Sequence, residues 1–252
     1  RITLTPETAR GIAELGLEVP VTGRIYVVLS RDGSEEPRQQ TGVTGVPFWG
    51  MDVRGLSGGD SVTLDTGGAN SMGDTSDGGV IGYPLPAFSD IPAGEYWLQP
   101  VLNVYTRFER ADGHVVEMHL NSGAGQGPMR APGNAYGAPI RVQIDPSSGG
   151  VIDLTLDAVI PPIEPLRDGE VLQQGNPRDS GRVKFVKIRS ELLSEFWGRD
   201  MYLGANVLLP AGYDEHPERR YPTIWMQGHF PGRSAPLGYG SRWRPEFAEF
   251  WD

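Results

Sequence analysis

Short segments in which apolar and polar residues alternate recur along the first 160 residues. Segments 24–30, 61–65, 95–105 and 141–145 are rich in β-branched, aromatic or alternating residues. In segment 151–157 the apolar residues fall on one face of a strand and the polar residues on the other: Ile152, Leu154 and Leu156 against Asp153, Thr155 and Asp157. Such strands, separated by turns, predict an antiparallel β-sandwich over residues 1–160. Residues 5–14 fit either a short helix or a leading loop.

A different pattern follows residue 160. Residues 161–182 are rich in proline and glycine, which predicts a semi-rigid linker. From residue 183 the order changes to a strand (183–188), a helical turn (192–197) and a strand that ends at Leu209. Residues 223–226 form a short apolar run, which predicts a buried strand, and a glycine-rich turn follows at 228–232.

Residues 244–251 predict the first turns of a helix. Pro245 suits the first helical position and Glu246 complements the helix dipole. Phe247, Phe250 and Trp251 are expected to share one face. Strand, glycine-rich turn and helix in this order predict an incomplete α/β domain over 183–252.

Composition narrows the class of protein. The chain has 35 glycines, 22 prolines, no cysteine and a net charge of −10. The acidic balance argues against a nucleic-acid partner and against an anionic membrane surface, and the absence of cysteine excludes thiol catalysis and disulfides. No apolar run approaches the ~18 residues of a membrane span. Because the chain begins at Arg1, we expect that a signal peptide or a tag was removed, and we expect a secreted or periplasmic protein.

Two glycine-rich loops, 66–90 and 121–138, are longer than most connections in compact domains. We expect them to lie over the neighbouring domain, and disorder is the alternative.

The segment Val207-Leu-Leu-Pro-Ala-Gly-Tyr-Asp214, followed by Arg220-Tyr-Pro222, resembles the opening of an α/β-hydrolase domain related to esterase D and the enterochelin esterases. The resemblance covers residues 183–252 and implies that the domain is begun here and not finished. Upstream, residues 91–105 with 111–114 resemble the N-terminal β-domain of larger bacterial esterases. Together these resemblances imply one enzyme, of which this chain is the N-terminal portion.

The resemblance also implies a role for the loop after residues 223–226. In acyl-transfer enzymes of this fold, that loop supplies one backbone N–H of the oxyanion hole. The donor would be Gly228, His229 or Phe230. Relatives usually have histidine followed by glycine, whereas this chain has Gly228 followed by His229, so the identity of the donor stays open. A plain turn is the alternative.

A nucleophile elbow needs G-x-S-x-G between a buried strand and a helix. The one match that we find is Gly55-Leu-Ser-Gly-Gly59, and an alternating strand follows it instead of a helix. We interpret residues 56–60 as a hairpin turn and Ser57 as a turn residue. The serine, acid and histidine of a triad would then lie beyond Asp252.

Other polar clusters suggest no metal or cofactor. His114, Glu117 and His119 give at most two converging ligands on a strand, and a metal needs three or four. Asp65, Asn70, Asp74 and Asp77 do not have EF-hand spacing. His216 lies in a charged connector and is expected at the surface. Arg242 and Arg244, which flank Trp243, fit an active-site mouth or the start of a helix equally well.

The sequence therefore predicts the N-terminal portion of a serine-dependent carboxylic ester hydrolase that acts on a small ester. It would contribute the β-domain and an oxyanion loop, and its partner would be the remaining C-terminal hydrolase segment or a cleaved second chain. The alternative is a non-catalytic β-sandwich module for binding or for interaction within a larger assembly.

Overall fold

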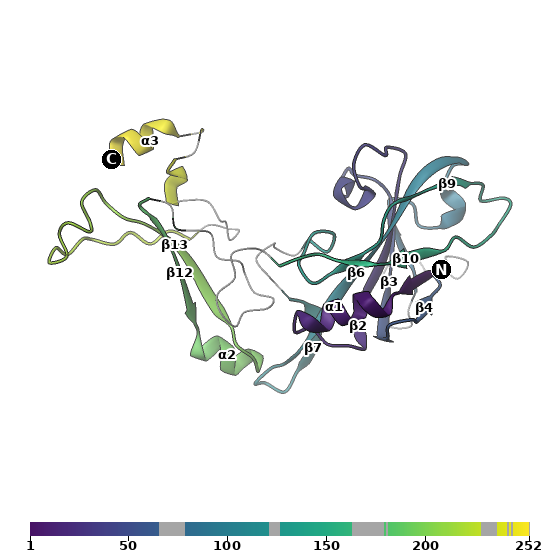
Figure 1. Ribbon diagram of the computed structural model, residues 1–252, viewed down its shortest axis with the longest axis horizontal. Coiled ribbons are helices and arrows are strands. Elements are labelled where there is room, and N and C mark those ends of the chain that lie inside the picture. Colours follow the sequence, from purple (N-terminus) through teal and green to yellow (C-terminus); the bar gives the residue numbers. More distant parts are fainter. Residues whose placement is uncertain are drawn as a thin grey trace. The chain divides into compact units, whose positions relative to one another are not determined.

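The computed structural model describes residues 1–65, 79–120, 127–162, 179, 181–227, 236–240, 242 and 244–251 (Figure 1). Over these residues the protein is mainly β, with antiparallel sheets and few helices, as the alternating segments predict. The chain divides into two compact units. The first comprises residues 1–108 and 115–174, and the second comprises residues 109–114 and 175–252.

The larger sheet of the first unit runs in the order β11-β8-β6-β2-β3-β5, and β7 and β9 also pair with β6. Its longest strand, β6, pairs antiparallel with β2 from Gly23 opposite Val104 to Ser30 opposite Trp97. The strands are β2 (Val21–Ser30), β3 (Phe48–Leu56), β5 (Ile81–Tyr83), β6 (Gly94–Glu109), β7 (Val115–His119), β8 (Ala135–Tyr136), β9 (Ile140–Ile144) and β11 (Ala158–Val159).

A smaller sheet, in the order β10-β1-β4, contributes to the same core. It consists of β1 (Ile2–Leu4), β4 (Ser61–Val62) and β10 (Leu154–Leu156). Strands β1 and β10 are parallel, and their inward residues Ile2, Leu4, Leu154 and Leu156 are buried with residues of the larger sheet. The alternation predicted for 151–157 is confirmed for its buried leucines and its exposed polar residues, although the strand itself is shorter.

Residues 6–14 form a helix, which settles the alternative that the sequence left open. Helix α1 (Pro6–Glu14) begins after Thr5, whose hydroxyl accepts a hydrogen bond from the Thr8 N–H at 3.1 Å. Proline at the first helical position leaves no additional N–H without a partner. Ala9 and Ile12 then bury the inner face of the helix in the core.

In the second unit, β12 (Val183–Arg189) and β13 (Tyr202–Leu208) form an antiparallel pair, with Val183 opposite Leu208. Helix α2 (Glu191–Trp197) connects the two strands. The Ser190 hydroxyl caps its start by accepting from the Leu193 N–H, and Gly198 ends it in the left-handed conformation (φ 66°) that glycine adopts without strain.

Helix α3 (Pro245–Trp251) lies at the opposite end of this strand pair from α2 (Figure 1). The Trp251 indole N–H donates to the carbonyl of Leu209 at 2.9 Å, and an Arg182 N–H donates to the Trp251 carbonyl at 3.1 Å. The prediction that Phe247, Phe250 and Trp251 share one face of this helix is wrong for Phe250. Phe247 and Trp251 pair at 5.8 Å, but Phe250 is 82% exposed because it lies about 100° around the helix from Trp251.

The buried strand predicted at residues 223–226 is also wrong. These residues have no regular secondary structure, and Ile224, Trp225 and Met226 are 81%, 87% and 62% exposed. An apolar run becomes a buried strand only when neighbouring strands satisfy its backbone groups and cover its side chains. Within the described parts of the chain, no strand pairs with it.

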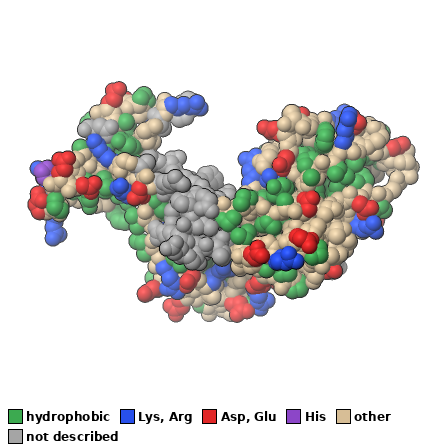
Figure 2. All heavy atoms as spheres, viewed as in Figure 1, with side chains coloured by type: hydrophobic (Ala, Val, Ile, Leu, Met, Phe, Trp, Pro, Cys, Tyr) green, Lys and Arg blue, Asp and Glu red, His purple; other side chains and the backbone are tan. Residues whose placement is uncertain are grey.

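Three short 3-10 helices complete the described structure: η1 (Pro37–Gln40), η2 (Phe88–Asp90) and η3 (Pro236–Gly238). Among the described helices, none combines the length and the apolar character that crossing a membrane requires. Acidic and basic side chains are interspersed over the face seen in Figure 2.

Candidate functional site

The predicted oxyanion residues Gly228, His229 and Phe230 lie outside the described residues. Their described flanks are the exposed apolar segment 223–226 on one side and η3 on the other. Their role therefore stays a prediction.

Ser57 occupies a tight turn. Its N–H is held by the Asp60 carboxylate at 2.9 Å, and its carbonyl accepts from the Asp60 N–H at 3.1 Å. The predicted hairpin is wrong in its connectivity, because β3 belongs to the larger sheet and β4 to the smaller one. The turn thus carries the chain from one sheet to the other. Since strand β4 follows it, the local geometry differs from the strand-to-helix turn of a nucleophile elbow.

The residues His114, Glu117 and His119 make separate contacts. The His114 N–H donates to the Asp112 carboxylate, Glu117 forms an ion pair with Arg54, and His119 Nδ1 lies 3.0 Å from the amide oxygen of Asn103. Among the described residues, no group of three or more His, Asp or Glu side chains is arranged to hold a metal ion.

The remaining candidates are dispersed. Asp65 is described, whereas Asn70, Asp74, Asp77 and Trp243 lie outside the described residues. His216 lies in the predicted charged connector, where its Nδ1 is 3.8 Å from the Glu218 carboxylate. The carbonyl of Arg244 accepts from the Phe247 N–H, and Arg244 directly precedes α3. Arg242 lies three residues before the first residue of that helix.

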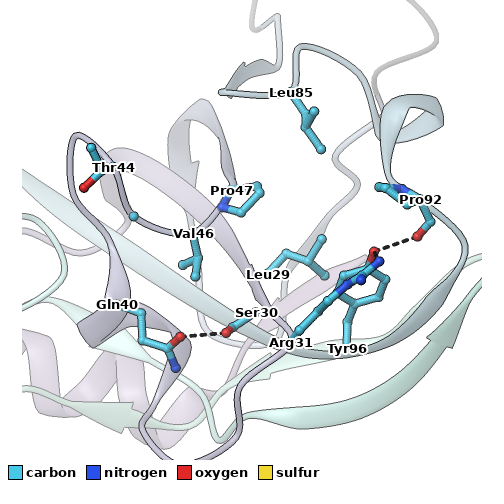
Figure 3. Close-up of a pocket in the computed structure, with 11 residues that line it drawn as sticks. Leu29, Ser30, Arg31, Gln40, Thr44, Val46, Pro47, Leu85, Pro92 and Tyr96 are labelled. Atoms are coloured by element: carbon cyan, nitrogen blue, oxygen red, sulfur yellow. Dashed lines mark hydrogen bonds between the residues drawn. The ribbon is translucent and has the colours of Figure 1, made fainter.

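A cavity of about 640 Å³ lies where β2 ends and β6 begins (Figure 3). Leu29 and Tyr96 in its wall belong to the core, and Leu85 packs against that core. The volume is within the ~300–1,000 Å³ range of small-molecule sites, and such sites are mostly apolar with a few polar groups. The lining residues are Leu29, Ser30, Arg31, Gln40, Thr44, Gly45, Val46, Pro47, Leu85, Pro92 and Tyr96.

Two polar residues of the lining satisfy each other and the nearby backbone. The Ser30 hydroxyl donates to the side-chain oxygen of Gln40 at 2.6 Å and accepts from the Asp32 N–H at 3.0 Å. The Gln40 amide donates to the carbonyls of Asp32 and Glu35. These groups shape the wall of the cavity and have little hydrogen-bonding capacity left for a ligand.

Arg31 and Tyr96 form the charged edge of the cavity. An Arg31 N–H donates to the Tyr96 hydroxyl at 2.8 Å, and the guanidinium carbon lies 5.0 Å from the centre of the Tyr96 ring. The Tyr96 hydroxyl in turn donates to the Pro92 carbonyl at 2.7 Å. Because the phenol both accepts from the guanidinium and donates to the backbone, it fixes Arg31 at this edge.

The turn after β2 sets the direction in which Arg31 leaves the strand. The Asp32 carboxylate accepts from the Ser34 N–H at 2.8 Å, and this hydrogen bond lowers the pKa of Asp32. Gly33 lies so close to the Trp97 indole that a β-carbon there would be 2.3 Å from its nitrogen. A larger residue at position 33 would therefore displace the turn.

No protein family model, curated protein or solved structure matches the chain. The cavity was not predicted from the sequence. Its residues come from segments 29–31, 40–47, 85, 92 and 96, and the pairing of β2 with β6 and β3, and of β3 with β5, brings these segments together. The one local signal was a charged residue, Arg31, directly after an apolar strand.

Proposed function

We propose that this chain is the N-terminal portion of a serine-dependent carboxylic ester hydrolase. In this proposal residues 1–160 form its β-domain, a β-sandwich, and residues 183–252 are the first elements of an α/β-hydrolase domain. The nucleophile and the other triad members come from the remaining hydrolase segment, which is either further along the same polypeptide or on a cleaved second chain.

The observation that carries the proposal is the exposure of three consecutive apolar residues, Ile224, Trp225 and Met226. Their place in the order of elements along the chain adds to it. A paired β12–β13 comes first, then this apolar segment, then a glycine-rich stretch, and then α3 anchored through Trp251 to Leu209. Contiguous apolar side chains with this exposure need cover from other residues. A complementary hydrolase segment supplies that cover.

In this proposal the chemistry of the chain rests on residues 228–230, which follow the apolar segment 223–226 in the sequence. A serine from the complementary segment attacks the carbonyl carbon of a small ester, and the alcohol leaves with the proton taken from the serine. Water then hydrolyses the acyl-enzyme to release the carboxylic acid. The role of this chain is to donate one backbone N–H to the oxyanion of each tetrahedral intermediate.

A fluorophosphonate probe tests the assignment of the nucleophile. On the complete encoded protein, we expect the probe to label the segment beyond residue 252 and to spare residues 1–252. We expect Ser57→Ala to leave aryl-ester turnover unchanged, because the Ser57 backbone is held within a turn between two sheets. Labelling of Ser57, or loss of turnover in a folded Ser57→Ala variant, would make Ser57 the nucleophile instead.

The exposed apolar segment also predicts how residues 1–252 behave alone. We expect the isolated chain to self-associate, because contiguous exposed apolar surface is rare on soluble monomers. Replacing both Ile224 and Trp225 by aspartate is expected to shift the sample toward a monomer in analytical ultracentrifugation. Leu192→Asp, at an 81% exposed position on α2, is the matched control. A non-aggregating wild-type monomer of 27.4 kDa would contradict the need for a complementary segment.

A non-catalytic binding module remains the alternative function. The cavity at the end of β2 and the start of β6 favours it, because that cavity is formed entirely by residues of the first unit. Absence of ester hydrolysis in the complete protein, together with ligand binding by residues 1–252, would select this alternative.

A further inference from the structure

We propose that the cavity at the end of β2 and the start of β6 binds a small molecule that combines one carboxylate with an apolar body. Arg31 binds the carboxylate, and the apolar wall holds the rest of the ligand. The proposal is independent of ester hydrolysis, because it concerns binding to residues of the first unit only.

The charge of the lining selects an anion. Arg31 is the one charged side chain among the eleven residues that line the cavity. Its polar contact is with a neutral phenol, and within the described part of the chain no carboxylate forms an ion pair with it. A guanidinium has five N–H donors, so most of its hydrogen-bonding capacity is available to a ligand.

The guanidinium is also held in place before a ligand arrives. Tyr96 is 5% exposed, its ring lies against the guanidinium, and its hydroxyl is fixed by the Pro92 carbonyl. Figure 3 shows the Arg31 side chain lying alongside the Tyr96 ring. A flexible arginine side chain loses rotamer entropy on binding, and a preorganised one loses less. Tyr96 is therefore a positioning residue that acts through Arg31.

The number of charges and the character of the wall indicate the ligand class. One planar guanidinium matches one carboxylate, with which it can form two parallel hydrogen bonds. A phosphate carries more charge than one arginine neutralises. The rest of the wall is apolar and consists of Leu29, Val46, Pro47, Leu85 and Pro92. The polar residues Ser30 and Gln40 are already hydrogen-bonded to each other. An aryl or alkyl carboxylate satisfies both parts of the site.

The test uses residues 1–252 with Ile224→Asp and Trp225→Asp, the changes expected to keep the chain monomeric. The probe is 4-phenylbutanoate, and 4-phenylbutanamide is its neutral counterpart. We expect isothermal titration calorimetry to detect the carboxylate and to show at least about tenfold weaker binding of the amide, the effect of losing one charge-assisted hydrogen bond. Arg31→Met is expected to weaken the carboxylate by a similar factor and to leave the amide unchanged. Arg10→Met, an exposed arginine on α1 away from the cavity, is the matched control.

The Tyr96→Phe variant tests whether Tyr96 positions Arg31 for the ligand or only maintains the structure of the cavity. The variant keeps the ring and loses the hydroxyl that holds Arg31. We expect weaker binding of 4-phenylbutanoate with unchanged binding of the amide, whereas a collapsed cavity would weaken both. The proposal would be overturned if acid and amide bound equally, if Arg31→Met bound the acid with full affinity, or if phenyl phosphate bound more tightly than the acid. It would also be overturned if Tyr96→Phe lost both ligands, or if the acid did not bind at about 10 mM.

Discussion

Replacing Gly228 by proline in the complete protein is expected to lower kcat for a simple aryl ester by about 10²–10³-fold, the usual effect of removing one oxyanion donor. Proline has no backbone N–H and fixes φ, so the change both deletes a donor and alters the turn. A backbone donor cannot be removed by a side-chain substitution, and this is the reason for choosing proline. Because the donor acts on charge that develops in the transition state, we expect kcat to fall more than KM rises.

The matched control is Gly42→Pro, a glycine-to-proline change in the first unit at a position with open space for a side chain. It should leave kcat unchanged. Circular dichroism checks that both variants keep the wild-type spectrum. A folded Gly228→Pro variant with wild-type kcat would place the donor elsewhere and would leave residues 228–230 as a plain turn. Loss of kcat in both variants would instead indicate a general effect on folding.

The elements of the β-domain could be predicted from local sequence because their signals are local. Leu154 and Leu156 alternate with exposed polar residues, and that alternation is itself the condition for one buried face. Pro245 gave the start of α3 because proline fits the first position of a helix. In both cases a few neighbouring residues determine the secondary structure and which side chains are buried.

The predictions from sequence are wrong where the structure of a segment depends on residues that are distant in the sequence. Residues 223–226 have a strand-like composition, but burial needs neighbouring strands that the described chain does not provide. The turn at 56–60 looks like a hairpin turn, yet β4 joins the smaller sheet because Val62 pairs with Ile2. Composition gives no information about that pairing.

The cavity could not be predicted from the sequence for the same reason. Ser30 and Gln40 are ten residues apart, and Arg31 and Tyr96 are separated by 65 residues. The register that places Ser30 opposite Trp97 brings Arg31 to Tyr96. A register shift by one residue would turn each side chain to the other face of the sheet and separate the pair. The candidate ligand site is thus a consequence of strand pairing.

Leu156→Ala is expected to lower the free energy of unfolding of the β-domain by about 2–5 kcal/mol. Leu156 has no exposed surface and lies opposite Leu4 in the smaller sheet, where both side chains enter the core shared with the larger sheet. Truncation removes buried apolar surface and leaves a cavity in the core that Leu156 shares with the larger sheet. Thr155→Ala, one residue away and exposed on the same strand, is expected to change stability by only about 0.5 kcal/mol or less. Urea unfolding followed by tryptophan fluorescence measures the difference. Trp197, Trp225, Trp243 and Trp251 are replaced by phenylalanine in all variants, so that the signal comes from Trp49 and Trp97. If the two variants unfold at the same urea concentration, the two sheets do not share the core that the structure assigns to them.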